Sequence, residues 1–160
     1  MKKINLAITG CMGRMGQQLI KSANKDKAFK ITSLTESKRI NKRIFGISPE
    51  INSIDAFKKA NVIIDFTVPK CTLEILKIAV KLKKKVVIGT TGFTKKDEQL
   101  IKSFSNKIPI LKAGNMSLGV NLLMYLTEIA SRSLGKTFLS NLSIWTIIVL
   151  VIIVVIYLIR

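Results

Sequence analysis

The stretch KINLAITGCMGRMG, residues 3 to 16, decides the fold. Its first half, residues 3 to 9, is an apolar run typical of a short buried parallel strand. Gly10, Gly13 and Gly16 then form a turn, and apolar residues recur at helical spacing beyond it. Such a turn lets a pyrophosphate approach backbone N–H groups, and the helix dipole favours the negative charge. A glycine turn made for packing alone remains the alternative.

Further strands and helices alternate along the chain after this turn. Strands are expected at residues 29–34, 62–66, 86–88 and 108–111, and helices at 55–60, 71–82, 95–104 and 118–134. Ser53 is placed to cap the first of these helices, and Thr94 with Asp97 forms a capping-box pattern. Residues 37–52 are expected to be a basic loop. The alternation predicts an α/β fold with a Rossmann-like, doubly wound parallel sheet.

The composition is strongly basic, with 27 Lys and Arg against 9 Asp and Glu and a net charge of +18. The lysines alternate with apolar residues at helical spacing, as on solvated helix faces, and no nucleic-acid motif accompanies them. Two cysteines without CxxC spacing, and no signal peptide, indicate a reducing cytoplasmic interior. The chain contains no histidine. We therefore expect no metal site and no nucleic-acid partner.

An acidic residue follows the glycine turn by about twenty positions, at the end of the second predicted strand. This residue, Glu36, is expected to bind the hydroxyls of an adenosine ribose. Lys38 and Arg39 lie just beyond it, where a cation could accept the 2′-phosphate of NADP or simply be solvated. The choice between NADH and NADPH stays open at this point.

Four motifs together resemble the family of dihydrodipicolinate reductase, an enzyme of bacterial lysine and diaminopimelate synthesis. They are GCMGRMG at 10–16, IDFT at 64–67 with Pro69 after it, IGTTGF at 88–93 and AGNMSLGVN at 113–121. The resemblance covers roughly the first 135 residues, about the N-terminal half of a full-length member. It implies that NADH or NADPH donates hydride to the cyclic dihydrodipicolinate skeleton.

The resemblance also implies a cofactor site at the carboxyl ends of the strands. Arg14 and Met15 join the three glycines at the pyrophosphate, and Glu36 binds the ribose. Around the nicotinamide and the wall of the cleft the resemblance puts Phe66, Thr67, Gly89, Thr90, Thr91, Ala113, Asn115 and Met116. For Thr90 and Thr91 the alternative is a polar turn whose side chains form hydrogen bonds at the strand ends.

The chain departs from the family after the helix at 118–134. The family's second domain brings a His-His-Arg-x-Lys motif and a Ser-Gly-Thr turn, and neither occurs here. We therefore name no catalytic residue and expect that this chain alone does not catalyse the reduction. The family's oligomer, which is assembled through that second domain, is equally in doubt.

The last residues form an apolar tail. The sequence divides into three parts: a dinucleotide-binding domain at 1–121, a helix at 122–136 that leads toward the missing substrate domain, and the tail at 137–160. One interpretation is a gene truncated or frameshifted near Gly135. A second is a transmembrane anchor over 144–159, with Trp145 and Tyr157 toward its ends and the basic domain in the cytoplasm. A buried strand pair is a weaker third, because no turn residues divide the run.

Overall fold

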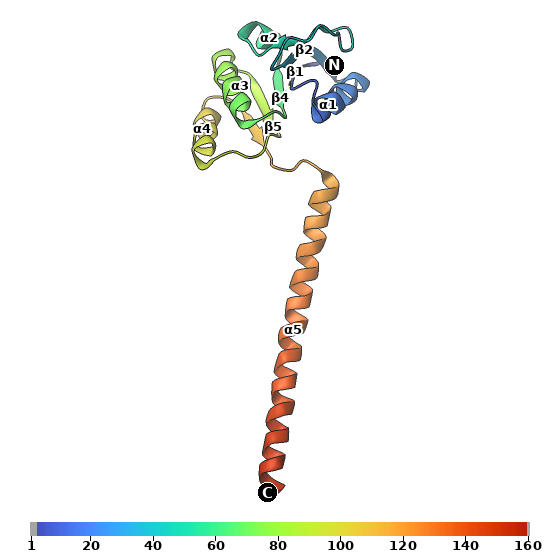
Figure 1. Ribbon diagram of the computed structural model, residues 1–160, viewed down its shortest axis with the longest axis vertical. Coiled ribbons are helices and arrows are strands. Elements are labelled where there is room, and N and C mark those ends of the chain that lie inside the picture. Colours follow the sequence, from blue (N-terminus) through green and yellow to red (C-terminus); the bar gives the residue numbers. More distant parts are fainter. Residues whose placement is uncertain (1–2, 160) are drawn as a thin grey trace. The chain divides into compact units, whose positions relative to one another are not determined.

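The computed structural model describes residues 3 to 159, with the side chains of 136–139 and 159 outside the description (Figure 1). Lys136 and Thr137, at the predicted boundary of the tail, are among these residues. The chain forms two compact units, Met1–Gly114 and Asn115–Arg160. Each unit is described by itself below.

The first unit is built on a parallel sheet, as predicted. Within the described residues the sheet has six strands in the order β3-β2-β1-β4-β5-β6, and every neighbouring pair is parallel. This order reverses direction at β1, which puts a crevice at the carboxyl ends of the strands on either side of it. The strands are β1 Ile4–Thr9, β2 Phe29–Glu36, β3 Glu50–Ile51, β4 Val62–Asp65, β5 Lys85–Ile88 and β6 Ile110–Lys112.

Helices cover both faces of the sheet, and alternate residues of β1 point to different cores. Ala7 packs in a cluster with residues of α2, α3 and α4, whereas Ile8 packs with Ile20 of α1. A strand has a side-chain period of two, so neighbouring residues face opposite sides of a sheet. The helices of this unit are α1 Arg14–Lys25, α2 Ile54–Lys58, α3 Pro69–Leu82 and α4 Lys95–Ser105, of which α1, α3 and α4 are labelled beside the sheet in Figure 1.

Several element bounds differ from those predicted, among them that of α2, which is Ile54–Lys58 rather than 55–60. The expected loop at 37–52 contains the short strand β3. Two residues are too few to predict a strand from sequence, and β3 forms because it pairs with Thr35 and Glu36 of β2. β4 ends at Asp65 rather than at residue 66, and α3 begins at Pro69, because proline suits the first turn of a helix. β6 begins at Ile110 because Pro109 has no N–H to donate to the ladder.

A buried carboxylate joins several of these elements. Asp65, at the end of β4, is fully buried and accepts hydrogen bonds from four threonine hydroxyls. Thr9 ends β1, Thr72 lies in α3, and Thr67 and Thr90 follow β4 and β5. A buried charge is costly unless it is hydrogen-bonded, and these donors satisfy both carboxylate oxygens. Asp65 therefore holds together the carboxyl ends of the strands.

The second unit is the helix α5, Leu118–Ile159, of 42 residues. It runs without interruption through the predicted boundary of the tail, and it rules out the interpretation of the tail as a pair of strands. Arg132 pairs with Glu128 one turn away at 2.6 Å. From residue 144 onward the helix is apolar except for Thr146, and by length and composition α5 could cross a membrane, with a mean hydropathy of 2.7 in its most apolar window of 18 residues. The predicted C-terminal apolar helix is therefore confirmed.

We predict that Asp65→Asn lowers the free energy of unfolding of the first unit by about 3 kcal/mol, because the amide nitrogen cannot accept from the hydroxyls that face it. Hydrogen exchange of β1 and β4 amides, followed by mass spectrometry in the full chain, measures the loss. Glu98→Gln is the matched control, since Glu98 pairs with Lys112 at an exposed position. Its cost should stay below about 1 kcal/mol. Equal losses in both variants would contradict the role given to Asp65.

Candidate functional site

The glycine turn brings the start of α1 very close to the end of β1. A Cβ on Gly16 would lie 2.1 Å from the carbonyl oxygen of Gly10, so no side chain fits there. Gly10 itself has φ +61°, and a Cβ on it would meet Thr67 at 2.8 Å. Gly13 donates its N–H to the Gly10 carbonyl at 3.0 Å. The close packing that the motif predicts is therefore present.

The N-terminus of α1 is left open by this turn. Its N-cap, Gly13, has no side chain to accept from the free backbone N–H groups of the first turn. The N-terminus of α4 is different, because Thr94 and Asp97 close it with a reciprocal capping box. Those hydrogen bonds also lower the pKa of the Asp97 carboxyl. Of these two helix ends, only α1 presents uncapped donors and a positive dipole end to an anion.

Glu36 lies beside the open helix end. One carboxylate oxygen accepts from the backbone N–H of Met12 at 3.0 Å, and the other accepts from the N–H of Ser37 at 3.0 Å. The side chain is therefore held against the glycine turn by backbone donors from both sides. Sequence spacing alone predicts that Glu36 lies near the turn, and the structure brings the two into direct contact.

A cavity of about 260 Å³ lies between the turn, the end of β2 and the start of α3. It contains five of the predicted site residues, which come from three separate segments of the chain. These five are Gly10, Gly13, Glu36, Phe66 and Thr67. We call this hollow the nucleotide cavity, after the dinucleotide that the sequence analysis expects at this edge of the sheet. Its position at the carboxyl ends of parallel strands, next to β1, is where such sheets bind ligands.

Phe66 and Gly89 also meet at this edge of the sheet. A Cβ on Gly89 would lie 2.0 Å from the Phe66 ring, so the glycine makes room for the aromatic side chain. Thr90 is buried, donates to Asp65 at 3.0 Å and accepts from the N–H of Thr67 at 2.9 Å. The hydrogen bonds expected of a polar turn at a strand end are thus made by Thr90.

The remaining predicted residues do not line the nucleotide cavity. Ala113 stays within the first unit, where its N–H donates to Ile88 beside Gly89. Asn115 belongs to the second unit and accepts from Ser117 at 3.0 Å, just before α5. The others are exposed and have no cavity contact, namely Arg14, Met15, Lys38, Arg39, Thr91 and Met116. Gly16 is buried against the turn.

Four cavity residues were missed by the sequence analysis: Ser37, Asn52, Val68 and Cys71. Asn52 reaches the cavity because it follows β3, so recognising that strand would have pointed to it. Its side-chain amide donates to the Cys71 sulfur at 3.2 Å. Burial raises the pKa of the Cys71 thiol, and burial together with Glu36 raises the pKa of Cys11 to about 11. Neither thiol is therefore activated as a nucleophile.

Solved structures share this fold. A dipicolinate-bound dihydrodipicolinate reductase from Paenisporosarcina sp. TG-14 matches with a TM-score of 0.67 and 24% identity, over 81% of this chain and 54% of its own. A homoserine dehydrogenase from S. aureus matches with a TM-score of 0.58 and 15% identity, over 70% of this chain and 32% of its own. At these identities the matches show the fold alone.

Sequence relatives are much closer. The chain is 70% identical over 141 residues to the 4-hydroxy-tetrahydrodipicolinate reductase of Pelagibacter ubique, over 88% of this chain and 55% of the relative. It is 43% identical to the same enzyme of Buchnera aphidicola, over 84% of this chain and 54% of the relative. The chain thus spans about half the length of these relatives. The family model for the N-terminus of dihydrodipicolinate reductase matches residues 4–116, and the chain therefore belongs to the dihydrodipicolinate reductase family.

Proposed function

We propose that residues 1–121 bind NADH or NADPH as the nucleotide-binding part of a dihydrodipicolinate reductase. One observation carries the proposal: the uncapped N-terminus of α1 opens beside the carboxylate of Glu36. A dinucleotide has a pyrophosphate next to a ribose. The N-terminus of α1 suits the negative charge of the pyrophosphate, and the Glu36 carboxylate can accept hydrogen bonds from the ribose hydroxyls. Membership of the family supports the same assignment.

Each side chain near the cavity then has a part in holding the cofactor. The pyrophosphate rests against the N–H groups of α1, which the missing Cβ of Gly16 allows to approach. Glu36 binds the ribose, and Lys38 and Arg39 are free to attract a 2′-phosphate. Phe66 and Gly89 form the wall toward the nicotinamide, with Thr91 and Ala113 beyond them. The bound dinucleotide supplies the hydride.

We further propose that this chain alone does not complete the reduction. Reduction of the cyclic substrate needs protein groups that hold it and supply a proton. The family's His-His-Arg-x-Lys motif is the source of those groups, and this sequence contains no histidine. On this proposal the 160 residues bind the cofactor without supplying the proton.

A membrane anchor is a second candidate role, and the apolar run of α5 favours it. A bilayer core of about 30 Å needs about 20 helical residues, with a lower limit of about 17, and residues 144–159 of α5 are close to that limit. Only its last half is free of charge, since Glu128 and Arg132 lie in the first half. Residues 144–159 would then cross the membrane, with the basic domain on the cytoplasmic side.

We predict that Gly13→Asp abolishes cofactor binding while the domain stays folded. Aspartate is a favoured N-cap, so its side chain would close the open end of α1 and repel the pyrophosphate. NADPH fluorescence, titrated with the full chain in detergent micelles, should be enhanced for the native chain. The variant should bind at least about tenfold more weakly.

Gly13→Ala is the control for this experiment, because it adds the same Cβ, 3.2 Å from the Gly10 carbonyl, without the charge. It should lose much less affinity than the aspartate variant. Equal losses would mean that space rather than charge decides binding at the turn. Salt-sensitive DNA binding without any NADPH response would instead favour a polyanion-binding role for the +18 charge.

Purified chain is expected to show no NADPH oxidation with dihydrodipicolinate precursor, even where NADPH binds. The assay is the loss of NADPH absorbance, with a complete reductase as the positive control. Turnover above the rate without enzyme would show that the essential groups lie within these 160 residues.

For the tail, the full chain should remain in the membrane pellet after alkaline carbonate extraction. Ile148→Arg with Ile152→Arg should release it, because a charge at the centre of a span costs about 3 kcal/mol. Leu122→Arg with Leu126→Arg is the matched control, with the same spacing in the first half of α5, and should leave the chain in the pellet. A native chain that is fully extracted would rule out the anchor.

A further inference from the structure

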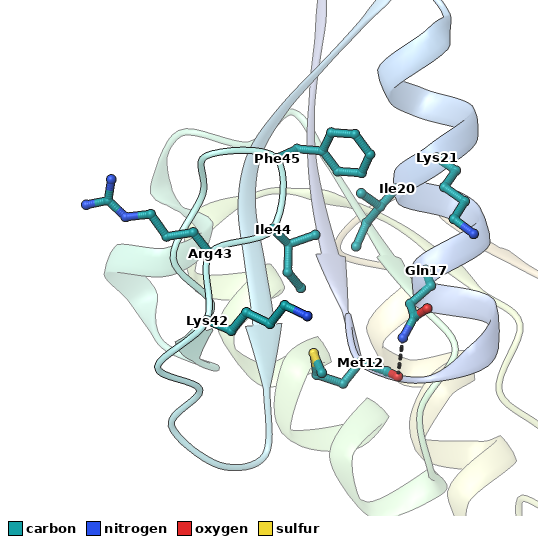
Figure 2. Close-up of a pocket in the computed structure, with 8 residues that line it drawn as sticks. All are labelled: Met12, Gln17, Ile20, Lys21, Lys42, Arg43, Ile44 and Phe45. Carbon is teal, nitrogen blue, oxygen red and sulfur yellow. Dashed lines mark hydrogen bonds between the residues drawn. The ribbon is translucent and has the colours of Figure 1, made fainter.

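A second cavity lies on the other side of the glycine turn, between α1 and the loop that follows β2 (Figure 2). Its volume is about 240 Å³. Ile20 of α1, Ile44 of the loop and Met12 of the turn give it apolar walls. It shares no lining residue with the nucleotide cavity. We call it the loop cavity.

The loop holds an aromatic ring over this cavity at the cost of backbone strain. Ile44 and Ile47 exchange two backbone hydrogen bonds, at 2.9 and 3.0 Å, around a two-residue turn. Phe45 and Gly46, at its centre, have φ +48° and +79°. Such turns favour Gly, Asn or Asp, and a bulky residue with positive φ is an outlier. Phe45 is 57% exposed, and its ring extends toward Ile20 (Figure 2).

One cation enters the cavity from the loop. The Lys42 ammonium lies between Ile44 and Met12 (Figure 2). Lys21 lines the wall on α1 with its ammonium on the outer side of the helix, and Arg43 turns away from the cavity (Figure 2). Neither lysine takes part in the ion pairs found among the described side chains, Lys112–Glu98 and Arg132–Glu128. A cation beside apolar walls attracts an anion more strongly than one surrounded by water. The loop cavity therefore combines apolar surface with uncompensated positive charge.

We propose that the loop cavity binds a small amphipathic anion, a single aromatic ring that carries a phosphate or carboxylate. The ring would lie beside Phe45 and Ile20, and the acidic group would meet Lys42. An apolar cavity of about 150 Å³ holds benzene, and drug-sized ligands need at least about 300 Å³, so a volume between these fits one substituted ring. This proposal is independent of the dinucleotide assignment.

Met12 is the natural reporter of this site. Its side chain lines the loop cavity, its N–H donates to Glu36, and its carbonyl accepts from Gln17 at 3.1 Å. The full chain, labelled with [¹³C-methyl]methionine in detergent micelles, would be titrated with phenyl phosphate. The Met12 methyl resonance, assigned with Met12→Leu, should shift saturably. Inorganic phosphate and benzyl alcohol should each bind at least about tenfold more weakly, because each offers half of the interaction.

Two variants test the charge and the ring separately. Lys42→Glu should weaken phenyl phosphate binding at least about tenfold, while Lys96→Glu, on exposed α4, changes it by less than about twofold. Phe45→Gly removes the ring and keeps the loop folded, because glycine adopts a positive φ without strain. Weaker binding of phenyl phosphate by this variant would therefore report the loss of the ring. Unchanged affinity in Lys42→Glu or Phe45→Gly overturns the proposal.

The nucleotide cavity is tested as the rival location with Gly13→Asp. That variant should keep its phenyl phosphate affinity within about twofold, because Gly13 lines only the nucleotide cavity. If Gly13→Asp loses phenyl phosphate affinity and Lys42→Glu does not, phenyl phosphate binds at the glycine turn, and the proposal is overturned. Absence of any saturable shift of Met12 would overturn it as well.

Discussion

The buried carboxylate of Asp65 is the interaction on which the rest of the first unit depends. It lies at the carboxyl end of β4, where the sheet changes direction, and the hydroxyls around it come from β1, α3 and the segments after β4 and β5. A carboxylate without these donors could not remain in the core. Their hydrogen bonds to Asp65 also hold Thr67 and Thr90 in place, and Thr67 lines the nucleotide cavity. The architecture of the core and the shape of the cavity are therefore joined at one side chain.

The N-termini of α1 and α4 illustrate how local sequence separates structure from function. The capping box of α4 satisfies its own first turn, so that helix end has no need of a ligand. The first turn of α1 has glycine where a capping side chain would stand, and its dipole and donors are left for an outside group. The missing cap lowers the stability of α1, and an anion bound at its N-terminus would compensate for that loss.

Met12 and Glu36 connect the two cavities through one hydrogen bond of 3.0 Å. Glu36 lines the nucleotide cavity, and Met12 lines the loop cavity. A ligand that displaces Met12 would therefore also displace the donor that holds the Glu36 carboxylate. By linkage, any such effect would act equally in the opposite direction, from the dinucleotide to the second ligand.

Much of this protein is determined by sequence alone, because its signals are local. The glycine spacing, the capping pattern of Thr94 and Asp97, and the alternating strands and helices each act within a few residues, and the parallel sheet and the glycine turn follow from them. The apolar run of the last helix is equally local. Tertiary structure alone decided the short strand β3, the four threonines around Asp65 and the two cavities. These depend on residues such as Asn52 and Thr9, which are remote in sequence from their partners and acquire a role only when the sheet brings them together.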